Sequence, residues 1–353
     1  MMPAIASRPA ALNELDTSGE ARLYLAMRHF WHPVMSSADL ADEPAAATLL
    51  GERLVLARLD GAPRCFPDLC VHRGSALSMG WVEDNQLRCR YHGWTYGSDG
   101  VCTSIPARFG GVIPNRARVR SYLAAERYGL VWVCLEEAPA LPIPDFPEFG
   151  APGFRVIQGA SYQWRCSAHR RVENFIDWSH IPWVHDGTLG SRDQPQVPEA
   201  DVTRDATGLR FGCHLRPPIG PAGEAVRADY TYHLAMPLTV HLRRTGPAGE
   251  ADVYVLHMTA TPIGPAECRS YWFLARNAPD VGADEGWLRM EAQVQQEDRP
   301  VVEGQRPEML PFELSAELHI KGIDRASLEY RKWLVELARK LSEGETGDAQ
   351  PAG

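Results

Sequence analysis

Two Cys–His pairs in the first third of the chain constrain its fold more than any other feature. Cys70 and His72 form the first pair, and Cys89 and His92 form the second after sixteen intervening residues. Two thiolates can bind one iron of a [2Fe–2S] cluster while two neutral imidazoles bind the other, which raises the reduction potential. The spacing therefore predicts two loops that hold a cluster with mixed ligands and pass on single electrons.

A structural zinc site is the alternative, because two cysteines and two histidines also make a tetrahedral zinc site. Zinc fingers usually group Cys with Cys and His with His, whereas each pair here supplies one of each. Gly74 and Gly93 follow the two pairs, and glycine allows tight loops whose N–H groups approach the cluster sulfides. The pattern favours a Rieske [2Fe–2S] cluster over zinc.

The composition is that of an ordinary globular protein, and 353 residues are enough for two domains with a core each. A formal net charge of −9 argues against a nucleic-acid surface. We expect Arg165, Arg170 and Arg171 on a helix or strand surface, or in a subunit contact. No stretch approaches about eighteen apolar residues, and the N-terminus lacks a signal-peptide core. These features predict a cytoplasmic protein without membrane or nucleic-acid partners.

The remaining six cysteines are predicted to be buried free thiols, which behave as small apolar residues. They are Cys65, Cys102, Cys134, Cys166, Cys213 and Cys268. Free thiols in so long a chain fit a reducing compartment.

The predicted fold class is α+β with two domains. Residues 1–27 are expected to form an N-terminal helix or arm, and residues 28–140 an all-β domain that carries the cluster. Prolines crowd the segment 138–153, where neither a helix nor a central strand can continue, so a domain boundary is expected there. Residues 141–353 are predicted to combine strands between 202 and 273 with helices from about 170 and about 286.

A second group of metal-binding residue types lies in the segment 173–185. It contains His180 and His185, and Asp177 lies three residues before the first of them. Pro182 is expected to break the helix, so that both imidazoles converge. Two histidines and a carboxylate form the facial triad of non-haem Fe(II) oxygenases. Asp177 is expected to accept the other N–H of a metal-bound histidine, so a third ligand must come from elsewhere.

Several blocks resemble Rieske non-haem iron oxygenases. The two cluster loops, written C-x-H-R-G and C-x-Y-H-G-W, resemble the Rieske domain of ring-hydroxylating and demethylating oxygenases. The further blocks are RHFWHPV, ERYGLVWV, ENFIDWSH-x4-H, EDRPVVEGQRP and EYRKWLVEL. Similar blocks occur in the same order in the vanillate O-demethylase and methylxanthine N-demethylase group.

The resemblance implies a C-terminal catalytic domain of the helix-grip type, with an antiparallel sheet and helices, and Asp298 as the third iron ligand. Glu297 and Glu303 stay possible on chemistry alone. It also implies a head-to-tail homotrimer in which the cluster of one subunit serves the iron of the next, with Asp177 between them. Because the chain has no GxGxxG fingerprint, electrons are expected from a separate NAD(P)H-dependent reductase of the flavin or ferredoxin type.

The leading functional hypothesis is a monooxygenase that uses O₂ to demethylate a small methylated aromatic or heteroaromatic compound, with formaldehyde release. A ring or alkyl hydroxylase or a dioxygenase on the same scaffold is the alternative, and a Rieske electron carrier without oxygenase activity is a third possibility.

The substrate pocket is expected after residue 205, with apolar and aromatic walls. The candidates are His257, Met258, Met236, Trp287 and Met290. Ordinary core packing is the alternative for each. A buried His257 needs a partner, which is either a substrate heteroatom or an internal hydrogen bond.

Overall fold

The computed structural model describes the chain apart from residues 1–17, 109, 111, 216–227, 278–283 and 348–353. The chain divides into two compact units. One is built on Met27–Ile143, and the other combines Thr17–Ala26 with the chain from Pro144 onward. We describe each unit by itself.

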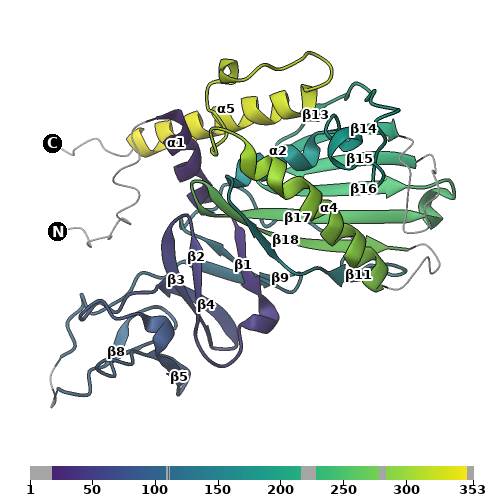
Figure 1. The fold of residues 1–353 in the computed structure, drawn as a ribbon. Helices are drawn as coiled ribbons and strands as arrows, with labels where there is room; N and C mark the ends of the chain where they lie inside the picture. Colours follow the sequence, from purple (N-terminus) through teal and green to yellow (C-terminus); the bar gives the residue numbers. More distant parts are fainter. Residues whose placement is uncertain (1–17, 109, 111, 216–227, 278–283, 348–353) are drawn as a thin grey trace. The chain divides into compact units, whose positions relative to one another are not determined.

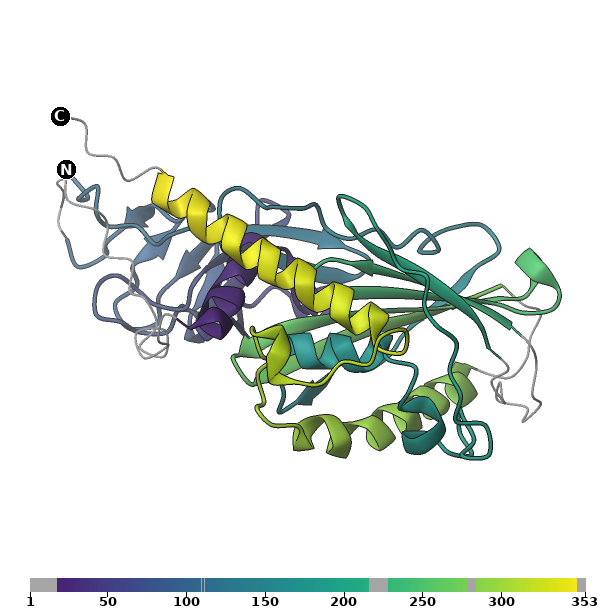
Figure 2. The same ribbon diagram turned by 90° about the horizontal axis from the view of Figure 1, so that it is seen from above.

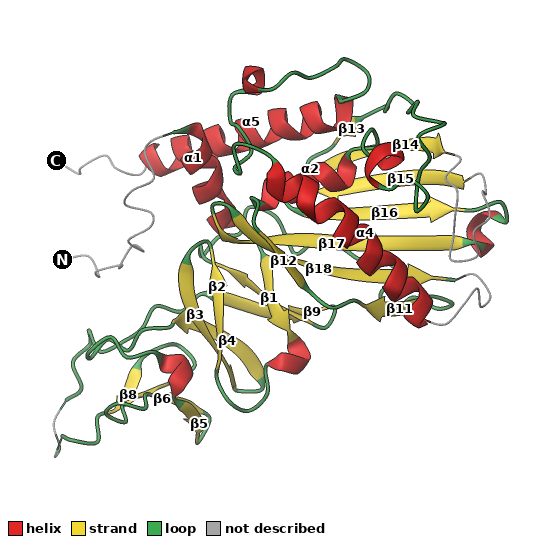
Figure 3. Ribbon diagram, viewed as in Figure 1, coloured by secondary structure: helices red, strands yellow, loops and turns green. Residues whose placement is uncertain are grey.

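The first unit consists of three small antiparallel sheets, and its all-β prediction is confirmed (Figure 3). The three sheets have the strand orders β1-β10-β9, β2-β3-β4 and β5-β6-β7-β8. The strands are β1 (His32–Ser36), β2 (Ala45–Leu49), β3 (Glu52–Leu59), β4 (Ala62–Pro67), β5 (Trp81–Glu83), β6 (Gln86–Arg88), β7 (Thr95–Tyr96), β8 (Cys102–Ser104), β9 (Leu123–Arg127) and β10 (Leu130–Cys134). Asp60 and Gly61 have positive φ angles of 55° and 71°, which suits the tight turn from β3 to β4.

The second unit is built on an eight-stranded antiparallel sheet, drawn in teal and green in Figure 1. The order is β11-β18-β17-β16-β15-β14-β13, and β12 also pairs with β18. The strands are β11 (Arg155–Gln158), β12 (Tyr162–Trp164), β13 (Thr203–Arg204), β14 (Gly208–Leu215), β15 (Ala228–Ala235), β16 (Thr239–Thr245), β17 (Val253–Gly264) and β18 (Glu267–Arg276).

Helices complete the second unit, so the predicted α+β class is confirmed. They are α1 (Gly19–Ala26), α2 (Ala168–Ile176), α3 (Ile181–Val184), α4 (Asp284–Gly304) and α5 (Arg325–Gly347). Figures 1 and 2 show α2 and α4 on the same face of the sheet. Helix α1 packs against α5. None of the helices among the described residues is long and apolar enough to span a membrane.

Two of the three arginines expected on the surface are buried. Arg170 is 1% exposed and Arg171 is 3% exposed, whereas the side chain of Arg165 is 82% exposed. Arg170 is buried because the carboxylate of Glu317, far along the chain, accepts hydrogen bonds from its guanidinium. A buried charge needs such a partner, and the local sequence does not reveal it.

All eight cysteines fall within the described residues, and each is a buried free thiol or, for Cys70 and Cys89, a buried cluster candidate.

Candidate metal centres and the adjoining cavity

The chain turns sharply at the segment that carries the two histidines. Ser167 caps the start of α2 by accepting a hydrogen bond from the backbone N–H of Arg170, and the helix ends at Asp177, whose ψ is 137°. The Asp177 carboxylate then accepts hydrogen bonds from the backbone N–H and the hydroxyl of Ser179, at 2.8 and 2.7 Å. The break therefore precedes His180, so Asp177 and His180 do not lie on one continuous helix.

Pro182 lies in the first turn of the new short helix α3, which begins just after His180. Proline suits this position because N–H groups of the first turn have no partner within a helix. Pro182 thus helps to start α3, and His185 follows the last residue of that helix.

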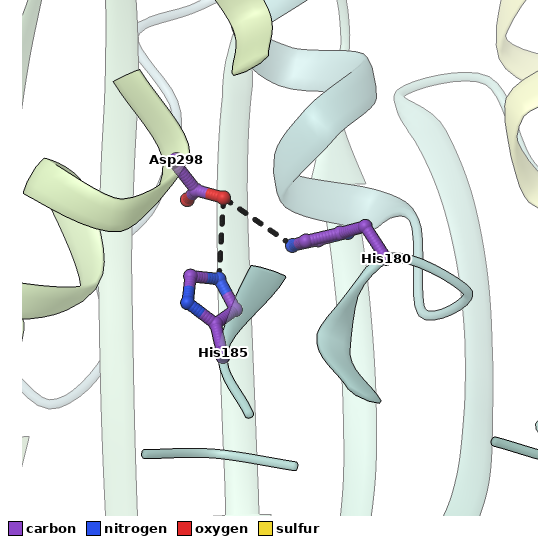
Figure 4. Close-up of side chains that lie close together, drawn as sticks. All are labelled: His180, His185 and Asp298. Carbon is purple, nitrogen blue, oxygen red and sulfur yellow. Dashed lines mark ion pairs between the residues drawn. The ribbon is translucent and has the colours of Figure 1, made fainter. Parts of the chain in front are cut away.

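His180 and His185 converge on Asp298 of α4, as Figure 4 shows. The Nε2 atom of His180 lies 3.4 Å from Asp298 Oδ1, and that of His185 lies 3.2 Å from the same oxygen. One ligand atom from each residue lies within 4.8 Å of the others. The structure therefore brings together two histidines and one carboxylate from segments that are far apart in the sequence.

Other acids hold the far side of each ring. Asp177 Oδ2 lies 3.2 Å from His180 Nδ1, and Glu297 Oε2 lies 2.7 Å from His185 Nδ1. These contacts favour a proton on each Nδ1 and leave each Nε2 free to bind a metal. Glu297, an alternative metal ligand in the sequence, lies on the wrong side of the His185 ring for that role.

Glu303, the other alternative, lies apart from the triad. Its carboxylate accepts hydrogen bonds from Arg299 and from the backbone N–H of Arg165.

Negative charge surrounds these imidazoles. Burial alone would lower the pKa of His180, yet the carboxylates of Asp177 and Asp298 outweigh burial and raise it to about 9. Burial would likewise raise the pKa of Asp298, but hydrogen bonds from the two histidines and the nearby Arg171 hold it well below its usual range. A divalent cation would satisfy this charge, and the donor set fits mononuclear Fe(II) with open coordination positions.

The two Cys–His pairs lie on adjacent loops of the first unit. Cys70 and His72 follow β4, and Cys89 and His92 follow β6. Both thiols are buried, at 2% and 1% exposure, and the two imidazole centroids are 4.5 Å apart. The buried His72 Nδ1 has no hydrogen-bond partner among the described residues. This donor set fits a [2Fe–2S] cluster with two thiolate and two imidazole ligands.

The arrangement of these loops disfavours zinc. Four ligands of a tetrahedral zinc ion lie about 2.0–2.3 Å from the metal and therefore close to one another. Within the described part of the chain, the His180, His185 and Asp298 group is the one set of three or more such residues that is compact enough for a single ion. The Cys–His pairs are more spread, as a cluster with two irons requires.

The triad opens onto a cavity of about 760 Å³ between the helices and the sheet. Strands β15 to β18 supply one wall, and α2, α3 and α4 supply the other. The lining includes the aromatic residues Phe175, Trp178, Tyr232, Tyr254, Trp272 and Trp287. A cavity of this size and character suits a small planar ligand.

Three of the five predicted pocket residues line the cavity. They are Met258, Trp287 and Met290.

His257 and Met236 do not line the cavity, and the prediction for them is wrong. Tyr254, Leu256 and Met258 face the cavity, so alternation along β17 turns His257 to the opposite face of the sheet. There its ring stacks on Phe146 at 4.6 Å, and neither ring nitrogen has a hydrogen-bond partner among the described residues. His257 therefore faces away from the cavity, and no internal hydrogen bond to it is found among the described residues.

Met236 lies in the turn between β15 and β16, outside the cavity lining. It is 2% exposed, and the carbonyl of the adjacent Pro237 accepts a hydrogen bond from Tyr330 of α5. Met236 is therefore a buried residue outside the cavity lining.

The sequence interpretation missed several polar residues of the cavity wall, among them Arg171, Asn174 and Glu291. Asn174 donates a hydrogen bond to Asp298 Oδ1 at 3.1 Å, and Arg171 donates to Asn174 at 2.7 Å. Glu291 lies seven residues before Asp298 on α4 and also lines the cavity. Residues seven apart share a helix face, so the spacing from Asp298 could have identified Glu291.

Comparisons with known proteins agree with this geometry. Residues 30–122 match the Rieske [2Fe–2S] domain, and residues 164–340 match the vanillate O-demethylase oxygenase C-terminal domain. The methylxanthine N3-demethylase NdmB of Pseudomonas putida is 36% identical, over 92% of this chain and 93% of that protein. The methylxanthine N1-demethylase NdmA of the same organism is 33% identical, over 90% and 91%.

Solved structures show the same fold. The structure of Pseudomonas putida CBB5 NdmB matches with a TM-score of 0.82 at 34% identity, covering 94% of this chain and 95% of that chain. Dicamba monooxygenase bound to dicamba matches with a TM-score of 0.78 at 23% identity, covering 90% and 99%.

Proposed function

Since this chain belongs to the Rieske non-haem iron oxygenases, we propose that it demethylates a small methylated aromatic or heteroaromatic compound by oxidising a methyl C–H bond. Members of this family are oxygenases with a Rieske [2Fe–2S] cluster and a mononuclear non-haem iron. The observation that carries the proposal is the triad of His180, His185 and Asp298 at the wall of an aromatic cavity.

The proposed ligands follow from the two donor sets. Cys70, Cys89, His72 and His92 would hold the cluster, and the triad would hold the iron. Bound there, the two groups would supply single electrons and O₂ activation at the open iron positions. The chain holds the ligand rings in place, orients a methyl group against the triad and excludes water with aromatic walls.

The stoichiometry of the reaction can be written for an N-methyl substrate. One O₂, two electrons and two protons are consumed, one oxygen atom enters the methyl group, and the other leaves as water. The resulting N-hydroxymethyl compound collapses to formaldehyde and the demethylated N–H compound. The electrons come from a separate reductase, as is usual in this family, and we infer that it depends on NAD(P)H.

We further propose a cytoplasmic homotrimer in which the cluster of one subunit serves the iron of the next. Asp177 is suited to the path between them because one carboxylate oxygen contacts His180 Nδ1 while its side chain stays 28% exposed. The six cysteines outside the cluster loops are free thiols, which supports a reducing compartment.

Formaldehyde release tests the proposed reaction. The purified oxygenase, a flavin-dependent reductase and NADH are incubated with a panel of N-methyl and O-methyl aromatic compounds. Stoichiometric formaldehyde is expected with at least one of them. A hydroxylated product without formaldehyde would instead indicate the hydroxylase alternative.

Iron content tests the proposed ligands. About three irons per chain are expected in the native protein and about two in His180→Ala, which should keep the Rieske EPR signal but lose turnover. Glu303→Gln is the matched control, because this acid lies on the same helix as Asp298 but outside the triad. Unchanged turnover in His180→Ala would contradict an oxygenase.

A further inference from the structure

One carboxyl group of the cavity wall lies beside aromatic and apolar side chains. Glu291 projects from α4 on the same face as Asp298, lines the cavity and is 5% exposed. Its neighbours in the wall include Trp287 and Met290. An isolated carboxyl group is costly in such surroundings unless it makes hydrogen bonds.

The described residues fill only part of the hydrogen-bonding capacity of the Glu291 carboxylate. The hydroxyl of Tyr254 donates a short hydrogen bond to Oε1, and Tyr254 is the one hydrogen-bond partner of Glu291 among the described residues. The Tyr254 ring is itself fixed, because it stacks on Trp287 with ring centroids 5.1 Å apart. A carboxylate has about four acceptor positions, so Glu291 retains acceptor capacity on a rigid support.

The cationic side chains of the cavity wall are already engaged. Arg171 donates hydrogen bonds to Tyr162 and Asn174, and Arg244 lies 3.6 Å from the Asp252 carboxylate. Glu291 therefore offers spare acceptor capacity in the described lining, whereas the donors of these two arginines already have partners. A substrate carboxylate placed there would meet another acid rather than a counter-ion.

We propose that Glu291, held by Tyr254, determines substrate specificity by accepting a hydrogen bond from a ring N–H, or an equivalent donor, of a planar heteroaromatic substrate. The inference rests on the proposed function and narrows its substrate class. It favours neutral or cationic compounds that carry a donor, and it disfavours aromatic carboxylates with the acid group at this wall. Burial raises the pKa of Glu291 to about 7, and its unprotonated oxygen can accept a hydrogen bond in either state.

The binding of two compounds that differ only in the ring N–H donor tests this hydrogen bond without turnover. Theobromine and caffeine differ at one ring nitrogen, which carries hydrogen in the first and methyl in the second. Their dissociation constants are measured on the oxidised, iron-loaded protein by calorimetry. We expect theobromine to bind about 10- to 100-fold more tightly than caffeine, as for a hydrogen bond to a charged group.

Variants test whether Glu291 causes the preference for theobromine over caffeine. Glu291→Leu keeps a similar volume but removes the acceptor, so the two dissociation constants should become about equal. Glu291→Gln keeps a carbonyl acceptor and should retain part of the difference. Tyr254→Phe tests the supporting hydroxyl and should reduce the preference by an intermediate factor. Glu285→Gln alters an exposed acid of the same helix and should leave the preference unchanged. Cluster absorption and iron content show that each variant is folded.

The inference is overturned by equal binding of the two compounds, by binding of neither, or by a preference that survives Glu291→Leu. These outcomes are separate from the test of demethylation. Selective binding without formaldehyde from any methylated compound would contradict the proposed reaction but not the recognition. Formaldehyde formed equally well from compounds with and without a donor would contradict the recognition alone.

Discussion

Two adjacent acids of α4 contact opposite sides of one histidine. Asp298 Oδ1 lies 3.2 Å from His185 Nε2, and Glu297 Oε2 lies 2.7 Å from His185 Nδ1. Consecutive helical residues point in different directions, so neighbouring carboxylates reach different atoms of the same ring. Thr188 and Gln293 also donate hydrogen bonds to Glu297 and fix its position.

Replacing Glu297 with alanine should weaken Fe(II) binding by about 10- to 100-fold, because His185 loses the acceptor that orients its ring. Glu297→Gln should cost less, since the amide carbonyl can still accept the Nδ1 proton. Iron is titrated against a competing chelator while the cluster absorption is followed. Glu303→Gln serves as the control, and native iron affinity in Glu297→Ala would show that this contact does not support the metal site.

At the scale of elements, a buried charge cluster ties α2 to α5 and to the loop before it. Arg331 of α5 donates hydrogen bonds to Glu173 of α2 and to Glu317, and Arg170 of α2 also donates to Glu317. Arg170 and Arg331 are 1% and 3% exposed. Because α2 leads directly to His180, this cluster also supports the segment that carries the histidines.

Low pH should weaken the ion pairs of Glu317 with Arg170 and Arg331. Burial opposes ionisation of Glu317, but hydrogen bonds from Arg170 and Arg331 outweigh it and lower its pKa to about 2. A lowered pKa contributes stability that is fully present above the unfolded value and is lost as the pH falls from about 4.5 towards 2.

Glu317→Gln should therefore lower the free energy of unfolding by about 1–2 kcal/mol at pH 7, a figure reduced for partial solvent exposure. The difference from the native protein should shrink as the pH falls below about 4.5. Thermal melts followed by circular dichroism across this range provide the measurement. Glu285→Gln, an exposed acid, should change stability by less than about 0.5 kcal/mol throughout. A pH-independent difference for Glu317→Gln would refute the electrostatic explanation.

The proposed trimer can be tested with hybrids, which are trimers assembled from two different variant subunits. A subunit with His180→Ala keeps its cluster but lacks the iron, and one with His72→Ala keeps the iron site but has a defective cluster. If electrons cross between subunits, hybrids purified with two different tags should regain part of the native formaldehyde production. Each variant alone should be inactive. Inactive hybrids that contain both subunits would indicate electron transfer within one chain.

Short motifs made much of the protein predictable from the sequence. Cluster ligands come from two tight loops, so their spacing alone indicated a mixed-ligand cluster at Cys70, His72, Cys89 and His92. Periodicity and turn residues predicted the all-β first unit and the α+β second unit, because these patterns act over a few residues. Asp298 was selected only through the resemblance to known oxygenases.

Tertiary structure decided which side each residue faces and which distant groups meet. Strand alternation turned His257 away from the cavity, and the partners that bury Arg170 and Arg171 come from other segments. The separation of Glu297 and Asp298 into different contacts likewise depends on how α4 lies against α3. Local sequence sets residue type and periodicity, whereas direction, burial and partner are fixed only when helices and sheet pack together.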